Sequence, residues 1–145
     1  MSQGEIMECE LCSGPGGVVL WAHEHLRVVL IDDLDYPGYC RVIWDEHIAE
    51  MTDLSVEQGL TIMEVVFGVE SALRRLFHPD KVNLASLGNM TPHLHWHVIP
   101  RFLGDRHFPQ PIWGMPQREV EVLPQVDLQK LKEVLGQILP KGRVE

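Results

Sequence analysis

The apolar positions of the chain form short runs near its start, separated by turn-forming residues. The runs cover residues 18–21, 26–31 and 39–44. Apolar runs of this length, bounded by turn formers, are typical of β-strands. Residues 32–38 between the second and third runs are rich in Asp, Pro and Gly, so we expect these two strands to pair as an antiparallel hairpin.

A long helix is predicted after these strands. Ser55 and Gln58 have the spacing of a capping box, in which each side chain bonds the backbone of the other residue. Apolar residues then follow at helical spacing over a wide stripe, which indicates that the helix packs on more than one side. The pair His78-Pro79 ends the helix, because proline disfavours helical backbone in the residue before it.

The second half of the chain predicts two more strands and a short helix. The strands cover residues 81–87 and 93–99, and a proline-rich, irregular tail follows at 109–124. Asp127 caps the last helix. Hairpin-type connections on both sides of one long helix favour an α+β fold with a five-stranded antiparallel sheet. We expect one domain over residues 1–145, with a core at about 5–103 and a C-terminal extension at about 104–145.

Charge and hydropathy limit the classes of partner. The 145 residues carry a formal charge of −9, which argues against a nucleic-acid polymer or an anionic membrane surface as partner. A small phosphorylated ligand needs only a local pocket of donors. No apolar run approaches the ~20 residues of a membrane span. The chain starts without the basic and apolar regions of a signal peptide, so we expect a cytoplasmic protein.

Three histidines alternate with apolar residues in the last predicted strand. His93, His95 and His97 would share one face of the strand, while Leu94 and the other intervening residues face the core. Three histidines opposite an apolar face favour a functional role over simple packing. Imidazole can serve as a metal ligand or as a nucleophile, and the alternation alone does not choose between the two.

The run His93-Leu94-His95-Trp96-His97-Val98-Ile99 resembles the signature of the histidine-triad (HIT) family, which is His-φ-His-φ-His-φ-φ with φ apolar. Pro100-Arg101 follows as in many bacterial members, and the similarity extends from Cys9 to Arg101. Asn83 and Gly88 resemble the asparagine-glycine loop that precedes the triad. The resemblance implies a HIT-like fold, a homodimer without a catalytic cofactor, and an enzyme of the diadenosine polyphosphate hydrolase type.

The resemblance also implies a mechanism. Family members hydrolyse or transfer nucleotides from dinucleoside polyphosphates, nucleoside phosphoramidates and nucleotide sugars. By resemblance, His95 attacks the α-phosphorus and forms a nucleotidyl-histidine intermediate, His97 contacts the phosphate, and His93 completes the catalytic triad. The implied substrate-binding residues are Asn83, Asn89, Thr91, Asp32 and Arg101.

The loop before the triad departs from the family pattern. Many members have Gly-Gln-Ser or Gly-Gln-Thr there, whereas this chain has Gly88-Asn89-Met90. Met90 cannot replace a hydroxyl that donates to phosphate, and Thr91 follows one position later. Two other interpretations therefore stay open: a nucleotide-binding sensor with little turnover, and a metal-dependent hydrolase that uses the three histidines as ligands. Against the metal-dependent hydrolase, the sequence has no carboxylate in or next to the triad to act as a further ligand or as a base.

Cys9 and Cys12 form a Cys-x-x-Cys pair, which alone is a weak signal. In several bacterial relatives such a pair binds a structural zinc ion together with the first histidine of the triad and a histidine after the third core strand. By resemblance these ligands are Cys9, Cys12, His47 and His93, a set suited to tetrahedral zinc. A closed site of this kind would fasten the N-terminus to the sheet.

Overall fold

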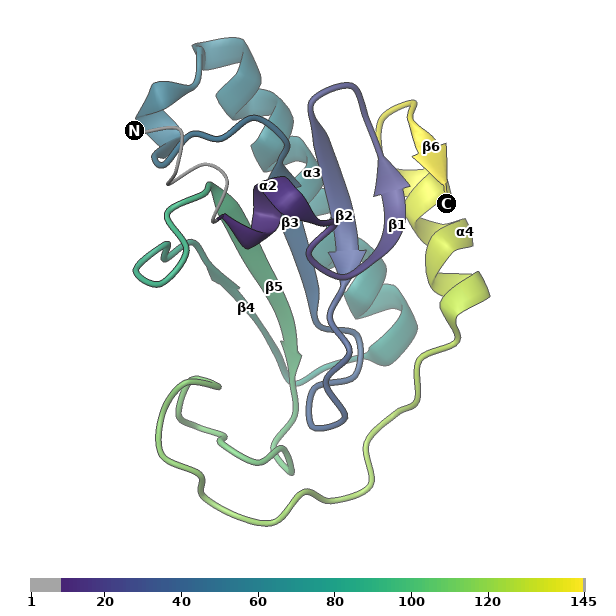
Figure 1. Ribbon diagram of the computed structural model, residues 1–145. Coiled ribbons are helices and arrows are strands. Elements are labelled where there is room, and N and C mark those ends of the chain that lie inside the picture. Colours follow the sequence, from purple (N-terminus) through teal and green to yellow (C-terminus); the bar gives the residue numbers. More distant parts are fainter. Residues whose placement is uncertain (1–8, 145) are drawn as a thin grey trace.

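The computed structural model describes residues 9–144 and has a six-stranded, fully antiparallel sheet (Figure 1). The strand order is β4-β5-β3-β2-β1-β6. The strands are β1 (Val18–Ala22), β2 (Leu26–Leu30), β3 (Cys40–Trp44), β4 (Lys81–Ala85), β5 (His95–Arg101) and β6 (Arg143–Val144). The expected pairing of the second and third strands is confirmed, with Leu26 opposite Trp44 and Leu30 opposite Cys40.

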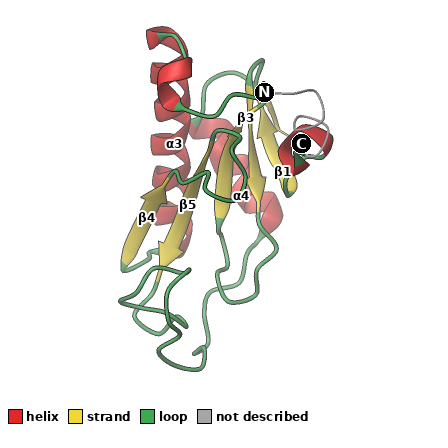
Figure 2. Ribbon diagram, turned by 60° about the vertical axis from the view of Figure 1, so that its left-hand side comes forward, coloured by secondary structure: helices red, strands yellow, loops and turns green. Residues whose placement is uncertain are grey.

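Two helices cover one face of the sheet. The long helix α3 (Val56–Phe77) packs on β3 and β5, and α4 (Leu128–Ile138) packs on α3 and β1 (Figure 2). The short helix α2 (Glu10–Ser13) lies in front of the sheet in Figure 1, on the face opposite α3. A 3-10 turn, η1 (Met51–Asp53), precedes α3. The second face of the sheet is therefore left to α2 and to loops.

Both predicted helix starts are confirmed. Ser55 accepts a hydrogen bond from the backbone N–H of Gln58, whose side chain accepts from the N–H of Ser55. The Asp127 side chain accepts from the N–H of Lys130 at the start of α4. His78 closes α3 in the left-handed conformation, directly before the proline that prevents the helix from continuing.

The alternation in β5 separates the core from the second face. Leu94 and Val98 belong to the main core beneath α3, and Trp96 packs against its edge. Leu131 and Leu135 of α4 are fully buried in the same core. The C-terminal helix is thus part of the cluster that holds the sheet together.

Three details of the sheet differ from the sequence-based expectation. A sixth strand, β6, pairs with the edge strand β1; it has two residues, too few to leave a hydropathy pattern. β4 ends at Ala85 rather than at 87. β5 begins at His95 rather than at 93, because the backbone N–H of Leu94 bonds the carbonyl of Ile48 outside the sheet ladder. His93 therefore lies outside the strand, and the expected bounds 93–99 are wrong at their start.

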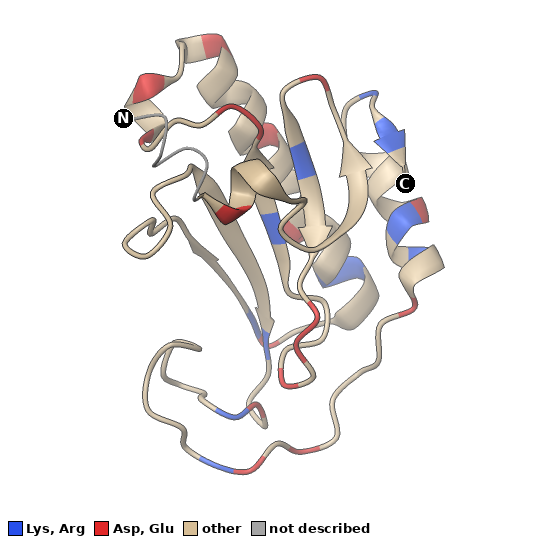
Figure 3. Ribbon diagram, in the orientation of Figure 1, with Lys and Arg blue, Asp and Glu red and all other residues tan. Residues whose placement is uncertain are grey.

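The surface carries its charges in a dispersed pattern. Acidic residues occur on helices and loops in several parts of the chain, and basic residues are scattered over strands, α3 and α4 (Figure 3). Within residues 9–144 no helix combines the length and the apolarity that crossing a membrane requires. Residues 5–8 of the expected core lie outside the described part of the chain.

The segment between β5 and α4, residues 102–127, has no regular secondary structure and is tied to the sheet by a buried ion pair. Arg101, the last residue of β5, donates from Nε and Nη2 to the carboxylate of Asp105 at 2.7 and 3.0 Å. Both side chains are at most 2% exposed. Arg118 donates to the carbonyls of Asp105 and Phe108, which draws the later part of the segment to the same point.

The Asp105 carboxylate is the acceptor around which this segment folds. It also accepts from the backbone N–H groups of Phe102, His107 and Phe108. Burial raises its pKa, but the hydrogen bonds from Arg101 and the backbone outweigh burial and hold the pKa below its ordinary value. The charged form is thus favoured in the folded protein.

Asp105→Asn should lower the free energy of unfolding by about 3 kcal/mol at pH 7, because it leaves a buried guanidinium without its counter-charge. A carboxylate with a depressed pKa stabilises the fold above its ordinary pKa, and this contribution is lost as the pH falls through the folded value. The difference in the free energy of unfolding between wild type and variant should therefore decrease toward ~pH 3. Urea unfolding at several pH values measures both effects. Glu119→Gln, the same change at an exposed site, is the control; equal stability of the two variants would contradict the role of the pair.

Candidate active site and metal cluster

A pocket of about 390 Å³ opens on the face of the sheet opposite α3. His95 and His97 of β5 and Arg41 of β3 lie on its strand side. The remaining lining residues come from α2, the loop before the triad and the 102–127 segment: Glu10, Leu11, Leu87, Gly88, Asn89, Met90, Thr91 and Trp113. Parts of the chain that are far apart in sequence thus meet at the histidines.

The ring of His95 is held by one hydrogen bond to the backbone. Its Nδ1 lies 2.5 Å from the carbonyl oxygen of His93. A carbonyl can only accept, so Nδ1 carries the proton and the lone pair is on Nε2. His95 is 7% exposed and lines the pocket. The arrangement presents a neutral, oriented imidazole to whatever enters.

His97 is held by Tyr39 and covered by Trp113. Its Nδ1 lies 2.6 Å from the Tyr39 hydroxyl, and its ring meets those of His95 and Trp113 edge-on, with centroids 4.9 Å apart in both cases. Trp113 itself is half exposed. The indole comes from the 102–127 segment, so that segment forms one wall of the pocket.

The environment keeps both pocket histidines uncharged. Burial lowers the pKa of His95; the bond to the His93 carbonyl opposes this effect, and the charge of Arg41 adds to it. Burial, His95 and Arg41 lower the pKa of His97 to about 3. Neutral imidazoles at pH 7 can act as nucleophile and hydrogen-bond donor.

The predicted loop residues lie at the pocket, with different contacts. Asn89 and Met90 are exposed, and Met90 is 95% accessible to solvent. The hydroxyl of Thr91 donates to the carboxylate of Glu10 in α2 at 3.2 Å. The loop therefore brings an amide and a hydroxyl to the rim of the pocket, while the methionine there is almost fully exposed.

The other predicted substrate-binding residues lie elsewhere. Asn83 and Arg101 line a neighbouring hollow of about 660 Å³ that shares Trp113 with the histidine pocket, and Arg101 donates to the Asn83 side-chain oxygen at 2.7 Å. Asp32 is exposed and lines a third hollow beneath residues 120–126. The contact of Asp32 with a ribose stays a prediction.

The aromatic residues of 107–113 predict a segment that covers either the pocket or a partner, and Trp113 lies at the pocket. Sequence reasoning did not single out Arg41 or Tyr39 as site residues. Arg41 is the one charged residue in the apolar run 39–44, which was a usable signal for a functional side chain. Ser86 was also missed; its hydroxyl donates to the His95 carbonyl at 2.8 Å. Tyr39 reaches His97 only through the tertiary fold, so no local pattern marks it.

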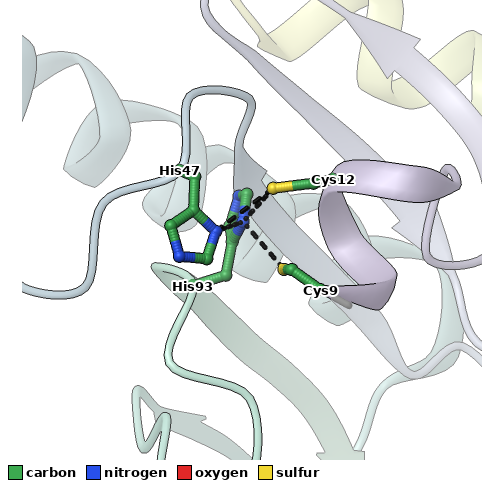
Figure 4. A group of neighbouring side chains, drawn as sticks. All are labelled: Cys9, Cys12, His47 and His93. Carbon is green, nitrogen blue, oxygen red and sulfur yellow. Dashed lines mark hydrogen bonds between the residues drawn. The ribbon is translucent and has the colours of Figure 1, made fainter. Parts of the chain in front are cut away.

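Cys9, Cys12, His47 and His93 form a compact cluster beside this pocket (Figure 4). Their ligand atoms all lie within 4.8 Å of one another. The Nδ1 atoms of the two histidines are 3.2 Å apart, and the Cys12 sulfur lies 3.1 Å from Nδ1 of His47 and 3.4 Å from Nδ1 of His93. The Cys9 sulfur is 3.4 Å from Nδ1 of His93.

The donor set and its geometry fit a tetrahedral zinc ion. Metal–ligand distances of ~2.0–2.3 Å give a tetrahedron with edges of ~3.3–3.8 Å, close to the separations in the cluster. Nε2 of His93 donates to the Trp44 carbonyl at 2.6 Å, which leaves the lone pair on Nδ1, the atom that faces the sulfurs. His95 and His97 do not belong to this group, so the described residues give no support to a metal held by all three histidines.

Comparisons with known proteins agree with this arrangement. The sequence profile of the HIT domain matches residues 17–104, more than half of the chain. A histidine triad protein from Bradyrhizobium japonicum has a TM-score of 0.69 and 28% identity over 86% of this chain and 92% of that one. One from Marinobacter aquaeolei VT8 has a TM-score of 0.67 and 29% identity over 83% and 91%.

A zinc-bound histidine triad family protein from Mycobacterium smegmatis shares the fold, with a TM-score of 0.65 and 22% identity over 91% of this chain and 96% of that one. A search of curated protein sequences found no match. HIT-domain proteins are generally nucleotide-binding hydrolases or transferases. The profile match over residues 17–104 shows that this chain belongs to the HIT-domain family.

Proposed function

We propose that the protein is a nucleotide hydrolase or nucleotidyl transferase in which His95 bonds covalently to the α-phosphorus of its substrate. The observation that carries this proposal is the hydrogen bond from Nδ1 of His95 to the His93 carbonyl, which leaves the nucleophilic lone pair on Nε2 of a ring that lines a pocket. Dinucleoside polyphosphates and nucleoside phosphoramidates are the substrates that the family resemblance favours.

In the first step Nε2 of His95 attacks phosphorus, a P–N bond forms, and the bond from phosphorus to the leaving group breaks. Water or a second acceptor then attacks the nucleotidyl-histidine and restores the imidazole. If the Tyr39 hydroxyl donates to Nδ1 of His97, the proton of His97 is on Nε2, where it can donate to a phosphate oxygen. Asn89 and Thr91 supply further donors at the rim.

Asn83 and Arg101 support the site from the neighbouring hollow. Arg101 is paired with Asp105 and bonded to Asn83, so we assign it a positioning role: it fixes the segment that carries Trp113. An indole at the wall of the pocket suits a flat nucleobase.

We also propose that Cys9, Cys12, His47 and His93 hold a structural zinc ion. Four protein ligands leave no open position for water, so the ion would link α2 to the start of β5 and would not take part in hydrolysis. The zinc-bound relative from Mycobacterium smegmatis supports this assignment.

A homodimer formed through β4 is the third proposal. β4 is an edge strand, and its Leu84 is 36% exposed. Glu70 of α3 lines the same hollow as β4, and Phe67, one turn earlier on α3, is 63% exposed. An unpaired strand beside an exposed apolar stripe is a surface that a second copy can cover.

His95→Ala should lower turnover at least ~1,000-fold, because it removes the nucleophile. Wild-type protein quenched in acid-free denaturant during turnover of diadenosine polyphosphates or adenosine phosphoramidate should carry a nucleotidyl adduct on His95, detected by mass spectrometry. EDTA in the assay should leave initial rates unchanged. His25→Ala, an exposed histidine outside the pocket, is the matched control. Turnover that survives in His95→Ala without any adduct would refute the mechanism.

Protein purified without chelator should contain about one zinc ion per chain, and Cys12→Ser should reduce this content strongly, because each ligand is needed for a closed site. Loss of ~3 kcal/mol on metal removal would lower the Tm by roughly 6–12 °C. Elemental analysis and thermal unfolding measure both. Cys40→Ala, which changes the cysteine outside the cluster, should keep its zinc. If the wild type purified without chelator contained no zinc, and chelator left its Tm unchanged, the protein would not bind the ion.

Phe67→Glu should convert the dimer to monomer, because it puts a charge into the proposed apolar contact. Light scattering coupled to size-exclusion chromatography gives the mass directly. Val122→Glu, at a fully exposed site on the 102–127 segment, should leave the mass unchanged. A wild-type mass of 16.6 kDa at micromolar concentration would exclude the dimer.

A further inference from the structure

One cation at the pocket, Arg41, forms no ion pair with the described residues. We propose that the Arg41 guanidinium binds the α-phosphate of the substrate, beside His97, and supplies the positive charge that the attacked phosphate requires. This inference rests on the proposed function, since it names a further substrate-binding residue of the same site.

The pairing of β3 with β5 places Arg41 next to the histidines. Arg41 is the partner of His97 in the antiparallel register, and directly opposite residues of such a pair project from the same face of the sheet. Both residues line the 390 Å³ pocket together with His95. The guanidinium therefore shares the space in which the phosphorus must lie for attack by His95.

The hydrogen-bonding capacity of Arg41 is incompletely used within the described residues. Its Nε is buried and has no hydrogen-bond partner, and none of the ion pairs found in residues 9–144 involves its guanidinium. The guanidinium lies over the Tyr39 ring, 5.8 Å from its centroid. A buried donor without an acceptor costs ~1–3 kcal/mol, which an anionic ligand in the pocket can recover.

Among the described residues that line the pocket, Arg41 is the only arginine or lysine. The ring of His95 is bonded to a backbone carbonyl and that of His97 to the Tyr39 hydroxyl, and Glu10 contributes a carboxylate, which accepts from Thr91. Arg101, the cation expected from the family pattern, lies in the neighbouring hollow and is neutralised by Asp105. In a chain of net charge −9, the Arg41 guanidinium forms no ion pair with Glu10, the one carboxylate of the described lining, so an anionic substrate can bind it.

The chemistry of guanidinium suits a phosphate. Its planar fork donates two parallel hydrogen bonds to phosphate oxygens, an arrangement that lysine cannot reproduce. Arg41 lines the same pocket as both histidines, so this fork can face a phosphate that His95 attacks.

The direct test compares ligands with and without the phosphate. Arg41→Met should weaken the binding of AMP about 10- to 100-fold and leave the affinity for adenosine unchanged, as measured by calorimetry. GMP and guanosine, measured in parallel, remove the dependence on base preference. Arg106→Met, which removes an exposed arginine outside the pocket, is the charge-matched control and should bind like wild type. Unfolding curves verify that the variants are folded.

Kinetic measurements then show which phosphate of the substrate Arg41 binds. If Arg41 binds the α-phosphate, Arg41→Met should lower kcat/KM about equally for a nucleoside phosphoramidate, which has only that phosphate, and for a dinucleoside polyphosphate; Arg41→Lys should recover part of the loss. If kcat/KM of Arg41→Met fell only for the dinucleoside polyphosphate, Arg41 would contact the leaving group, and the assignment to the α-phosphate would be wrong. If Arg41→Met bound AMP within threefold of the wild-type affinity, Arg41 would not bind phosphate at all.

The two proposals fail in different ways. A wild type that binds AMP through Arg41 without forming an adduct on His95 would refute the reaction and keep the phosphate contact. A wild type that forms the adduct while Arg41→Met behaves normally would keep the reaction and refute the contact.

Discussion

The hydrogen bond between the ring of His95 and the carbonyl of His93 is the interaction on which the site depends. It fixes the tautomer of His95, and its acceptor belongs to a residue that is itself held from two sides. The ring of His93 donates to the Trp44 carbonyl at the end of β3 and faces the cluster with Cys9 and Cys12. The backbone of His93 thus serves the pocket while its side chain serves the cluster. Anything that loosens α2 or the end of β3 acts on the orientation of the neighbouring imidazole.

Two arginines on the same face of the sheet show how the surroundings decide what a buried cation does. Arg101 at the end of β5 is paired with the Asp105 carboxylate, which also accepts from three backbone N–H groups. The charge of Arg101 therefore stabilises the conformation of the 102–127 segment. Arg41 on β3 has no such partner among the described residues and faces the pocket. Residue type and strand position are similar; the nearby acceptor makes the difference.

The predictable parts of this protein are those set by local chemistry. The capping box at Ser55 follows from hydrogen bonds within four residues, and the burial of Leu94 and Val98 follows from the alternation of a strand. The departure of His93 from the strand could not be predicted, because it depends on a bond between Leu94 and the distant Ile48. β6 exists because the chain after α4 returns to β1, and two residues leave no pattern.

The same division applies to the site: its local patterns could be predicted from the sequence, and its tertiary contacts could not. The alternating histidines located His95 and His97, and the family resemblance brought the four residues of the Cys/His cluster together before their positions were known. Arg41 required the register of β3 against β5, and only the path of the 102–127 segment decides that Trp113 lies at the pocket and not elsewhere. Such contacts between residues dozens of positions apart are set by tertiary packing, which no window of sequence contains.

The 102–127 segment is held at both of its ends, by Asp105 beside β5 and by the packing of α4 into the core. Between these anchors, residues 119–122 are exposed and without regular structure. Lengthening a tethered loop costs little, ~0.6 kcal/mol for each doubling. Insertions and substitutions at this stretch can therefore accumulate without unfolding the sheet. A HIT protein of this architecture can vary the border of the hollow beside Asp32, which residues 120–122 line, without changing the histidine pocket.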